Sequence, residues 1–330
     1  MRKLASIQLI KDVRPIENAD SIEAIQVLGW QCVAKKGEFQ LGDYCVYIEI
    51  DSVLPEDNIY FSFLAAKKYR IKTIKLRGQI SQGIAFPISI LPSSTEIIEG
   101  LEVTDILNIK KYEPQVPIHL SGIAKGSFPS FIPRTDETRI QSVPEVLTRH
   151  QGTPCVVTEK LDGTSITIYY NNGEFGVCSR NLEWKEESNN LYWQVTKKHD
   201  LENILLGINR NIAIQGEVIG PSLQKNRYAL SEHTIKVFDI FDIDKYQYIN
   251  RHFLKEWALI LSIDVVPVLS TYNINDDLDY LVDMSMGTSI LNPKVQREGI
   301  VIRPFIECQD EELGRLSFKV INPNYLLKYE

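Results

Sequence analysis

The residues best suited to chemistry in this 330-residue chain lie in its second half. The segment Glu159-Lys160-Leu161-Asp162-Gly163 places a lysine after an apolar stretch and just before a glycine turn. A lysine amine can act as a covalent nucleophile when it is kept neutral, and nearby cations or a metal ion lower its pKa. Taken alone, a lysine in this position is more often part of an ordinary hairpin, so the interpretation needs further residues.

Other segments downstream carry side chains suited to a phosphate or a nucleotide. Arg180 follows the next apolar stretch and could clamp a phosphate through its planar guanidinium. Glu217 lies inside an apolar stretch, where a carboxylate requires a partner. Phe238 could be ordinary core, whereas Glu298 and Lys319 could aim a carboxylate and an amine at one cleft. Singly, each charge is more often a surface residue at a strand end.

Apolar patterning predicts the elements that position these residues. Strands are expected at 156–159, 164–170, 175–179, 212–218, 234–240, 299–303 and 316–321, and a helix over 186–206. Shorter strands separated by glycine turns are expected at 30–34, 44–50, 70–76 and 80–88, which is typical of a small barrel or sandwich. A stretch rich in proline and glycine from about 114 to 144 indicates a boundary between the two parts.

Composition excludes several classes of protein. The 44% hydrophobic and 24% charged residues match a globular protein, and the net charge of −7 argues against nucleic-acid binding through bulk charge. The five cysteines form no CxxC pair and the histidines are scattered, which argues against a zinc site. The charged amino terminus lacks a signal-peptide core and no apolar stretch could span a membrane, so we expect a cytoplasmic protein without a membrane partner.

Taken in order, the downstream segments resemble motifs I, Ia, III, IIIa, IV and V of the covalent nucleotidyltransferases, the superfamily of polynucleotide ligases and messenger-RNA capping guanylyltransferases. The segments 18–22, 42–48, 51–55, 74–83 and 131–139 are similar to the fifth family of ATP-dependent RNA ligases. Only eleven residues follow Lys319, which leaves no room for the carboxy-terminal OB domain of DNA ligases and capping enzymes.

This resemblance implies an α+β fold. Residues 1–115 would form an OB-like β-barrel that binds nucleic acid, and 116–138 would form a linker. Residues 139–330 would form a mixed α/β, ATP-grasp-like nucleotidyltransferase domain of antiparallel sheets and helices. The implied activity is sealing of a 3′-hydroxyl RNA end to a 5′-phosphate end, at nicks in duplexes, through lysyl-AMP and an adenylylated 5′ end.

The resemblance also implies roles for single residues, with Lys160 as the nucleophile that carries AMP. The residues implied to bind ATP are Arg139, Glu159, Leu161, Arg180, Glu217, Phe238 and Lys319. Those implied to hold Mg²⁺ or Mn²⁺ are Asp162, Glu217 and Glu298. Motif V often contains two lysines in the wider superfamily, but this chain has only Lys319 there, so Lys236 or Arg303 could assist.

A cationic segment precedes the pocket motifs. Residues 67–77 hold six cations and no acid, and in a strand Lys68, Arg70 and Lys72 would share one face. This predicts a track for the phosphate backbone, with a solvated edge strand as the alternative. The expected partner is RNA, or an RNA/DNA duplex with a strand break, bound by a monomer. The alternative functions are an ATP-dependent DNA ligase, a capping nucleotidyltransferase that uses GTP, and a non-catalytic nucleic-acid-binding OB protein.

Overall fold

The computed structural model describes residues 3–112, 124–187 and 189–329, which divide into two compact units. One unit contains the amino-terminal residues up to 115, Arg139–Glu145 and the residues from Pro323 onward. The second contains residues 116–138 and Val146–Asn322. Residues 116–123 of the expected linker lie outside the described residues. None of the described helices is long and apolar enough to cross a membrane.

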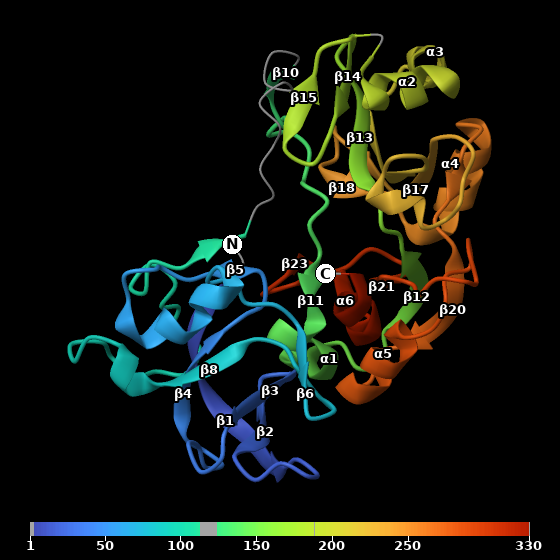
Figure 1. Ribbon diagram of the computed structural model, residues 1–330. Helices are drawn as coiled ribbons and strands as arrows, with labels where there is room; N and C mark the ends of the chain where they lie inside the picture. The colour runs from blue at the N-terminus through green and yellow to red at the C-terminus, as the bar shows by residue number, and fades with distance from the viewer. Residues whose placement is uncertain (1–2, 113–123, 188, 330) are drawn as a thin grey trace. The chain divides into compact units, whose positions relative to one another are not determined.

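The amino-terminal unit is built on an antiparallel sheet with the strand order β3-β2-β1-β4-β8 (Figure 1). Its strands are β1 (Ala5–Pro15), β2 (Ile22–Val27), β3 (Trp30–Lys35), β4 (Tyr44–Ile48) and β8 (Ile84–Pro87). Strand β3 alternates along its length, so that Trp30, Cys32 and Ala34 enter the core. This alternation is what a sheet with one buried face requires.

The cationic segment does not form the single strand expected over 70–76. A 3-10 helix, η1 (Ile59–Lys67), ends at Lys68, which has a left-handed backbone and donates its N–H to the carbonyls of Leu64 and Ala65. Within the segment, Arg70 forms an isolated bridge with Val53, and β6 (Ile74–Leu76) pairs with β7 (Gln79–Ser81). Lys68, Arg70 and Lys72 therefore do not share one face of a strand, because a helix end and an irregular segment replace it.

The amino-terminal unit also contains shorter elements outside this sheet. They are β5 (Ser52–Val53), η2 (Ile88–Ile90), β9 (Lys110–Lys111), η4 (Ile140–Ser142) and α6 (Pro323–Tyr329). Two further elements, β11 (Thr138–Arg139) and α1 (Glu145–Arg149), lie where the chain passes between the units.

In the second unit, the described residues form an eight-stranded sheet. Its strands follow the order β10-β15-β14-β13-β16-β17-β18, and the eighth strand, β19, pairs in parallel with β17 outside this order. Its strands are β10 (Ala124–Ser127), β13 (Thr164–Asn171), β14 (Glu174–Cys178), β15 (Leu182–Trp184), β16 (Ile212–Ile219), β17 (Thr234–Asp242), β18 (Gln247–Tyr248) and β19 (Asp264–Val265). Strand β10 lies within the segment expected as a linker, and Phe128 and Ile132 beyond it enter a buried cluster with Tyr169.

A second sheet of this unit contains the strands β24-β21-β12-β20. They are β24 (Phe318–Ile321), β21 (Gly299–Pro304), β12 (Pro154–Lys160) and β20 (Val268–Asn273), and all pairs are antiparallel. Strand β12 has neighbours on both sides and is buried from Cys155 to Glu159. This explains its nearly continuous apolar sequence.

Helices cover the larger sheet (Figure 1). The expected helix over 186–206 is two helices, α2 (Leu191–Lys198) and α3 (Leu201–Ile208), because Asp200 takes a left-handed backbone between them. They pack against β14 and β13 through a core that includes Trp193, Leu201 and Leu205. The remaining elements are η5 (Gln224–Asn226), η6 (Arg251–Phe253), α4 (Leu254–Ile260), α5 (Leu278–Ser285), β22 (Gln309–Asp310) and β23 (Gly314–Arg315).

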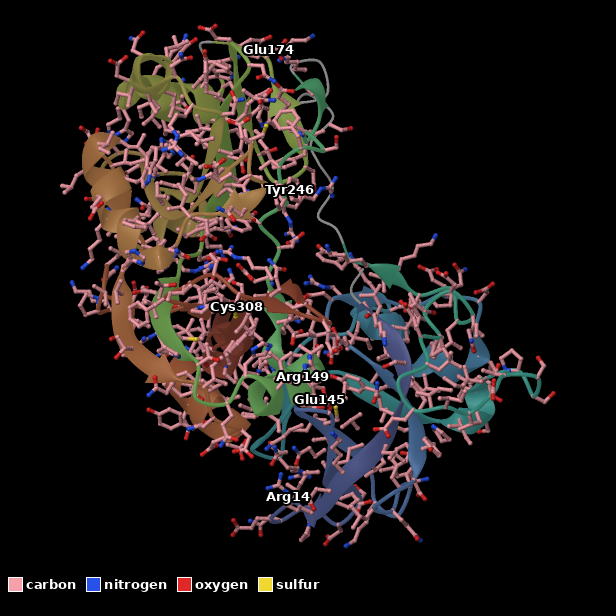
Figure 2. The ribbon with its side chains drawn as sticks, turned by 180° about the vertical axis from the view of Figure 1, so that it is seen from behind. Arg14, Glu145, Arg149, Glu174, Tyr246 and Cys308 are labelled. Carbon is pink, nitrogen blue, oxygen red and sulfur yellow. The ribbon has the colours of Figure 1, made fainter. Side chains whose placement is uncertain are left out.

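The hairpin β22–β23 is attached to α1 by a cluster of charges. Arg149, labelled in Figure 2, donates from Nε and Nη2 to the two carboxylate oxygens of Asp310, at 3.0 and 3.1 Å. His150 Nε2 lies 2.9 Å from Oδ2 of the same carboxylate. These contacts, with backbone N–H donors, hold the pKa of Asp310 well below its ordinary value. The cluster thus has a structural role in joining the hairpin to the helix.

Candidate active site

Strand register brings Lys160 and the later motif residues together. Lys160 ends β12 opposite Gly299 of β21, and Val301 of β21 lies opposite Lys319 of β24. Glu298 immediately precedes β21, and its Oε1 accepts a hydrogen bond from Lys160 Nζ at 2.5 Å. Side chains that are 138 positions apart in the sequence therefore form one ion pair at the end of a buried strand.

Glu217 joins this group from the other sheet, where β16 pairs with β13 just beyond the lysine turn. Gly163 donates its N–H to Glu217 Oε1 at 3.1 Å. Burial raises the pKa of Glu217 to about 8; the negative charge of Glu298 adds to the rise and the positive charge of Lys160 opposes it. A Cβ at position 163 would lie 2.2 Å from the Val218 carbonyl oxygen, so the close approach of turn and strand requires glycine.

A cavity of about 300 Å³ opens at this point, within the second unit. Its lining contains most of the residues implied by the sequence: Glu159, Lys160, Leu161, Asp162, Arg180, Glu217, Phe238, Glu298 and Lys319. Glu159 is buried, and its Oε2 accepts the Ile290 N–H at 2.8 Å while burial raises its pKa. The described lining combines two lysines, two arginines, six carboxylates and one aromatic ring, which suits a polyanion with a planar ring.

Asp239, the residue after Phe238, is surrounded by three arginines, of which Arg251 and Arg303 are buried and Arg315 is largely buried. Asp239 accepts two hydrogen bonds from Arg315, both at 2.9 Å, and lies 3.2 Å from Arg303 Nε and 3.4 Å from Arg251 Nη1. Their charges outweigh the effect of burial and hold the pKa of Asp239 below its ordinary value. Arg303 also lines the cavity, with its Cζ 5.5 Å from the centre of the Phe238 ring.

The two residues that could assist Lys319 in place of a second motif V lysine, Lys236 and Arg303, lie in different places. Arg303 lines the cavity, and its Nη2 donates to Glu137 Oε1 at 2.6 Å. Lys236 is not among the described residues of the lining, and its Nζ lies 2.5 Å from Asp264 Oδ2. Arg303 is the one of the two that the fold keeps beside the cavity.

Two implied site residues are held by partners within the unit. Arg180 Nη2 pairs with Asp136, and both side chains are about half exposed. Asp162 pairs with Arg227, and both are largely buried. The sequence indicates no role for Asp136 or Arg227. Asp136 lies within the segment 131–139, which resembles a known family, whereas no sequence pattern marks Arg227.

Arg139 belongs to the amino-terminal unit and is not among the described residues that line the cavity. Its Nη2 donates to Asp51 Oδ2 at 3.0 Å, and Arg70 Nη2 donates to Oδ1 of the same carboxylate at 3.2 Å. The guanidinium of Arg70 also stacks 3.5 Å from the centre of the Tyr112 ring. Asp51 thus links one cation expected to bind the nucleotide with one expected to bind nucleic acid.

The carboxylates of the cavity fit a divalent cation. Glu298 Oε2 is buried without a hydrogen-bond partner among the described residues, and burial, with a smaller contribution from the charge of Glu298, raises the pKa of Glu217. No group of three or more histidine, cysteine, aspartate or glutamate side chains that could hold a metal occurs in the described parts of the chain. A metal here would take further ligands from water and phosphate, which is the usual arrangement for Mg²⁺.

Comparisons with known proteins agree with this geometry. An OB-fold domain model matches residues 4–88, and an RNA ligase model matches residues 153–321. No curated protein sequence matches the chain.

Similar solved structures come from the RNA ligase of Naegleria gruberi. A mutant with ATP and Mn is 37% identical, with a TM-score of 0.90 and coverage of 98% of each chain. A mutant with AMP and Mn is 38% identical, with a TM-score of 0.90 and the same coverage. The ligase with PPi is 38% identical, with a TM-score of 0.89 and coverage of 99% of this chain and 98% of that chain. An identity of this level over nearly the whole length shows common membership, so the chain belongs to the RNA ligase family.

Proposed function

We propose that this protein is an ATP-dependent RNA ligase that joins a 3′-hydroxyl RNA end to a 5′-phosphate end at nicks in duplexes, acting as a monomer. The observation that carries the proposal is Lys160, whose Nζ lies 2.5 Å from Glu298 in a cavity that also contains Phe238 and Lys319. The ATP, AMP and Mn in structures of the Naegleria relative support the choice of nucleotide and metal.

The first step is self-adenylylation. Lys160 Nζ attacks the α-phosphorus of ATP, a P–N bond forms, and the bond to the β-phosphate oxygen breaks as pyrophosphate leaves with its electron pair. The proton of the amine passes to Glu298 Oε1, its nearest carboxylate oxygen. Positioning and charge stabilisation carry most of this phosphoryl-transfer chemistry. The product is lysyl-AMP.

The lining of the cavity supplies the nucleotide site. Phe238 stacks on the adenine, and Glu159 and Leu161 contact the base and phosphate through their backbone groups. Arg180 and Glu217 contact the ribose, and Lys319 neutralises the α-phosphate. Arg139, whose Nη2 is paired with Asp51, contacts the AMP phosphate, as the resemblance implies.

Glu217 and Glu298 would hold Mg²⁺ or Mn²⁺, with Asp162 nearby in the lining. When bound, the ion would neutralise phosphate charge and favour the uncharged lysine. Two features support this assignment: Glu298 Oε2 is buried and has no hydrogen-bond partner in the described parts of the chain, and the pKa of Glu217 is raised.

Two further transfers complete the reaction. A 5′-phosphate oxygen attacks the phosphorus of lysyl-AMP, the P–N bond breaks, and the amine of Lys160 is regenerated. The 3′-hydroxyl then attacks the 5′-phosphorus, and AMP leaves. Lys68, Arg70 and Lys72 of the amino-terminal unit contact the phosphate backbone, where each cation favours binding by releasing counterions.

The test begins with α-labelled ATP and Mn²⁺. Wild-type protein should become labelled, Lys160→Ala should not, and GTP should give little label. A panel of nicked duplexes that differ only in the sugar at the 3′-hydroxyl end should then be joined best with RNA there. A wild-type protein that never becomes labelled would contradict the proposal. Labelling by GTP would indicate a capping enzyme, and equal joining of DNA ends would indicate a DNA ligase.

A further inference from the structure

The loop after β16 packs directly onto the turn that follows the nucleophilic lysine. Arg227 forms an ion pair with Asp162, and the two side chains are 11% and 12% exposed. The buried Tyr228 accepts the Asp162 backbone N–H at its hydroxyl oxygen, at 2.7 Å. Gln224 Nε2 donates to the Gly163 carbonyl at 3.4 Å. The loop therefore contacts the turn through both the backbone and the side chain of Asp162.

The loop has an unusual backbone. Five of its non-glycine residues have a positive φ: Ser222, Gln224, Lys225, Asn226 and Ala229. Such conformations cost energy and persist where the surroundings impose them, and they cluster at functional sites. Here Asn226 and Leu230 exchange hydrogen bonds within the loop, and Asn292 attaches the loop from outside by donating from Nδ2 to the Arg227 carbonyl at 2.7 Å.

Packing adds to these polar contacts. Tyr228 belongs to an apolar cluster with Leu161, Ile219 and Val266. Leu161 lies between Lys160 and Asp162, so the cluster contacts the turn at Leu161 and Arg227 contacts it at Asp162. Lys160 is the last residue of β12, so its position depends on the turn that follows as well as on its ion pair with Glu298. The loop supports that turn.

We propose that Arg227 and Tyr228 are positioning residues for the nucleophile: by holding Asp162 and the turn 161–163, they aim Lys160 Nζ at the α-phosphorus. This inference rests on the proposed function. In the structure the carboxylate of Asp162 is paired with a largely buried guanidinium, so Asp162 is the residue through which Arg227 reaches the turn. Misplacing a nucleophile by about 1 Å can lower a rate by about 100-fold, so the effect should appear in the step that uses Lys160.

The test separates the steps of the reaction. Single-turnover lysine adenylylation at saturating ATP should slow at least about 10-fold in Arg227→Met and about 3-fold in Tyr228→Phe, with partial rescue in Arg227→Lys. Joining of a nick whose 5′ end already carries AMP bypasses Lys160 and should stay within about 2-fold of wild type. The double variant Asp162→Asn/Arg227→Met should be no slower than the slower single variant, because both changes break one contact.

A matched control is Arg210→Met. Arg210 Nη2 also pairs with a buried aspartate, Asp242, at 3.1 Å, but neither residue lines the cavity in the described structure. This variant should adenylylate within about 2-fold of wild type. If Arg227→Met destabilises the fold, Tyr228→Phe provides the same comparison of steps with a smaller change.

The proposal would be overturned if both Arg227→Met and Tyr228→Phe adenylylated at the wild-type rate. It would also be overturned if they lost joining of pre-adenylylated ends to the same extent as adenylylation. A shift of the half-saturating Mn²⁺ concentration in Asp162→Asn, without a shift in Arg227→Met, would indicate that Asp162 acts on the metal and not through its pair with Arg227, and would also overturn the proposal. Absence of labelling in the wild-type protein would instead contradict the proposed function itself.

Discussion

The nucleotide cavity and the cationic segment 67–77 hold their charges in different ways. In the cavity, charged residues come from adjacent strands, and the register of those strands decides which side chains meet, as with Lys160 and Glu298. In the segment, the cations lie along a helix end, an irregular stretch and a short hairpin, and Arg70 is held by a stack on Tyr112 and an ion pair with Asp51. Paired strands bring together charged side chains that are distant in sequence. The cations of 67–77 are neighbours in sequence, but they do not share one face.

This comparison predicts that substitutions near the cavity act on the whole fold. Asp239→Asn leaves Arg251, Arg303 and Arg315 without their shared, buried carboxylate, which should lower the free energy of unfolding by about 3–5 kcal/mol. Denaturant unfolding measures this change. Asp242→Asn on the same strand is the control and should cost only about 1 kcal/mol, because its partner Arg210 is half exposed. Equal losses for the two variants would contradict the importance of the buried arginine cluster.

Gly163, in the turn that follows Lys160, provides a second test. In Gly163→Ala the new Cβ would overlap the Val218 carbonyl oxygen, so the turn must move away from β16. We expect a loss of about 2–3 kcal/mol in the free energy of unfolding and a larger loss of lysine adenylylation. Gly207→Ala, in helix α3, should be neutral or stabilise by up to about 1 kcal/mol, because its Cβ would meet no neighbour. Normal adenylylation in Gly163→Ala would show that the close approach of turn and strand is dispensable.

Much of the cavity could be predicted because its residues lie in or beside strands with visible apolar patterns. Glu217 was recognisable as a carboxylate in an apolar strand, and Lys160 as a lysine before a turn. The supporting loop could not be predicted, since the positive φ angles around Arg227 occur at non-glycine residues. For the same reason the left-handed Asp200 that divides the helix over 186–206 gave no signal. The pairing of Arg139 with Asp51 joins residues 88 positions apart, and no sequence pattern indicates it.

The raised pKa of Glu217 predicts a pH dependence of stability. Because the folded state binds this proton more tightly than the unfolded state, the stabilisation is complete below pH 4.5 and is lost as the pH rises through 8. In EDTA, the unfolding free energy of wild type should fall across this range by about 1–2 kcal/mol more than that of Glu217→Gln, whose side chain stays neutral. Added Mn²⁺ should reduce the difference if Glu217 contacts the metal. Parallel pH profiles in EDTA would show that the carboxyl group is not protonated in the folded state.

The cationic segment should show the smallest effects on stability and a separate effect on activity. Lys68 is exposed at the end of η1, so Lys68→Glu should change the free energy of unfolding by less than about 0.5 kcal/mol. It should lower nick joining a few-fold at low salt while sparing self-adenylylation, and the deficit should shrink as salt screens the charges. Arg70→Glu should additionally cost about 1 kcal/mol, because it places two carboxylates together at Asp51 and loses the stack on Tyr112. If Lys68→Glu impaired adenylylation as strongly as joining, the cation would act on the nucleotide step, and the contrast between segment and cavity would fail.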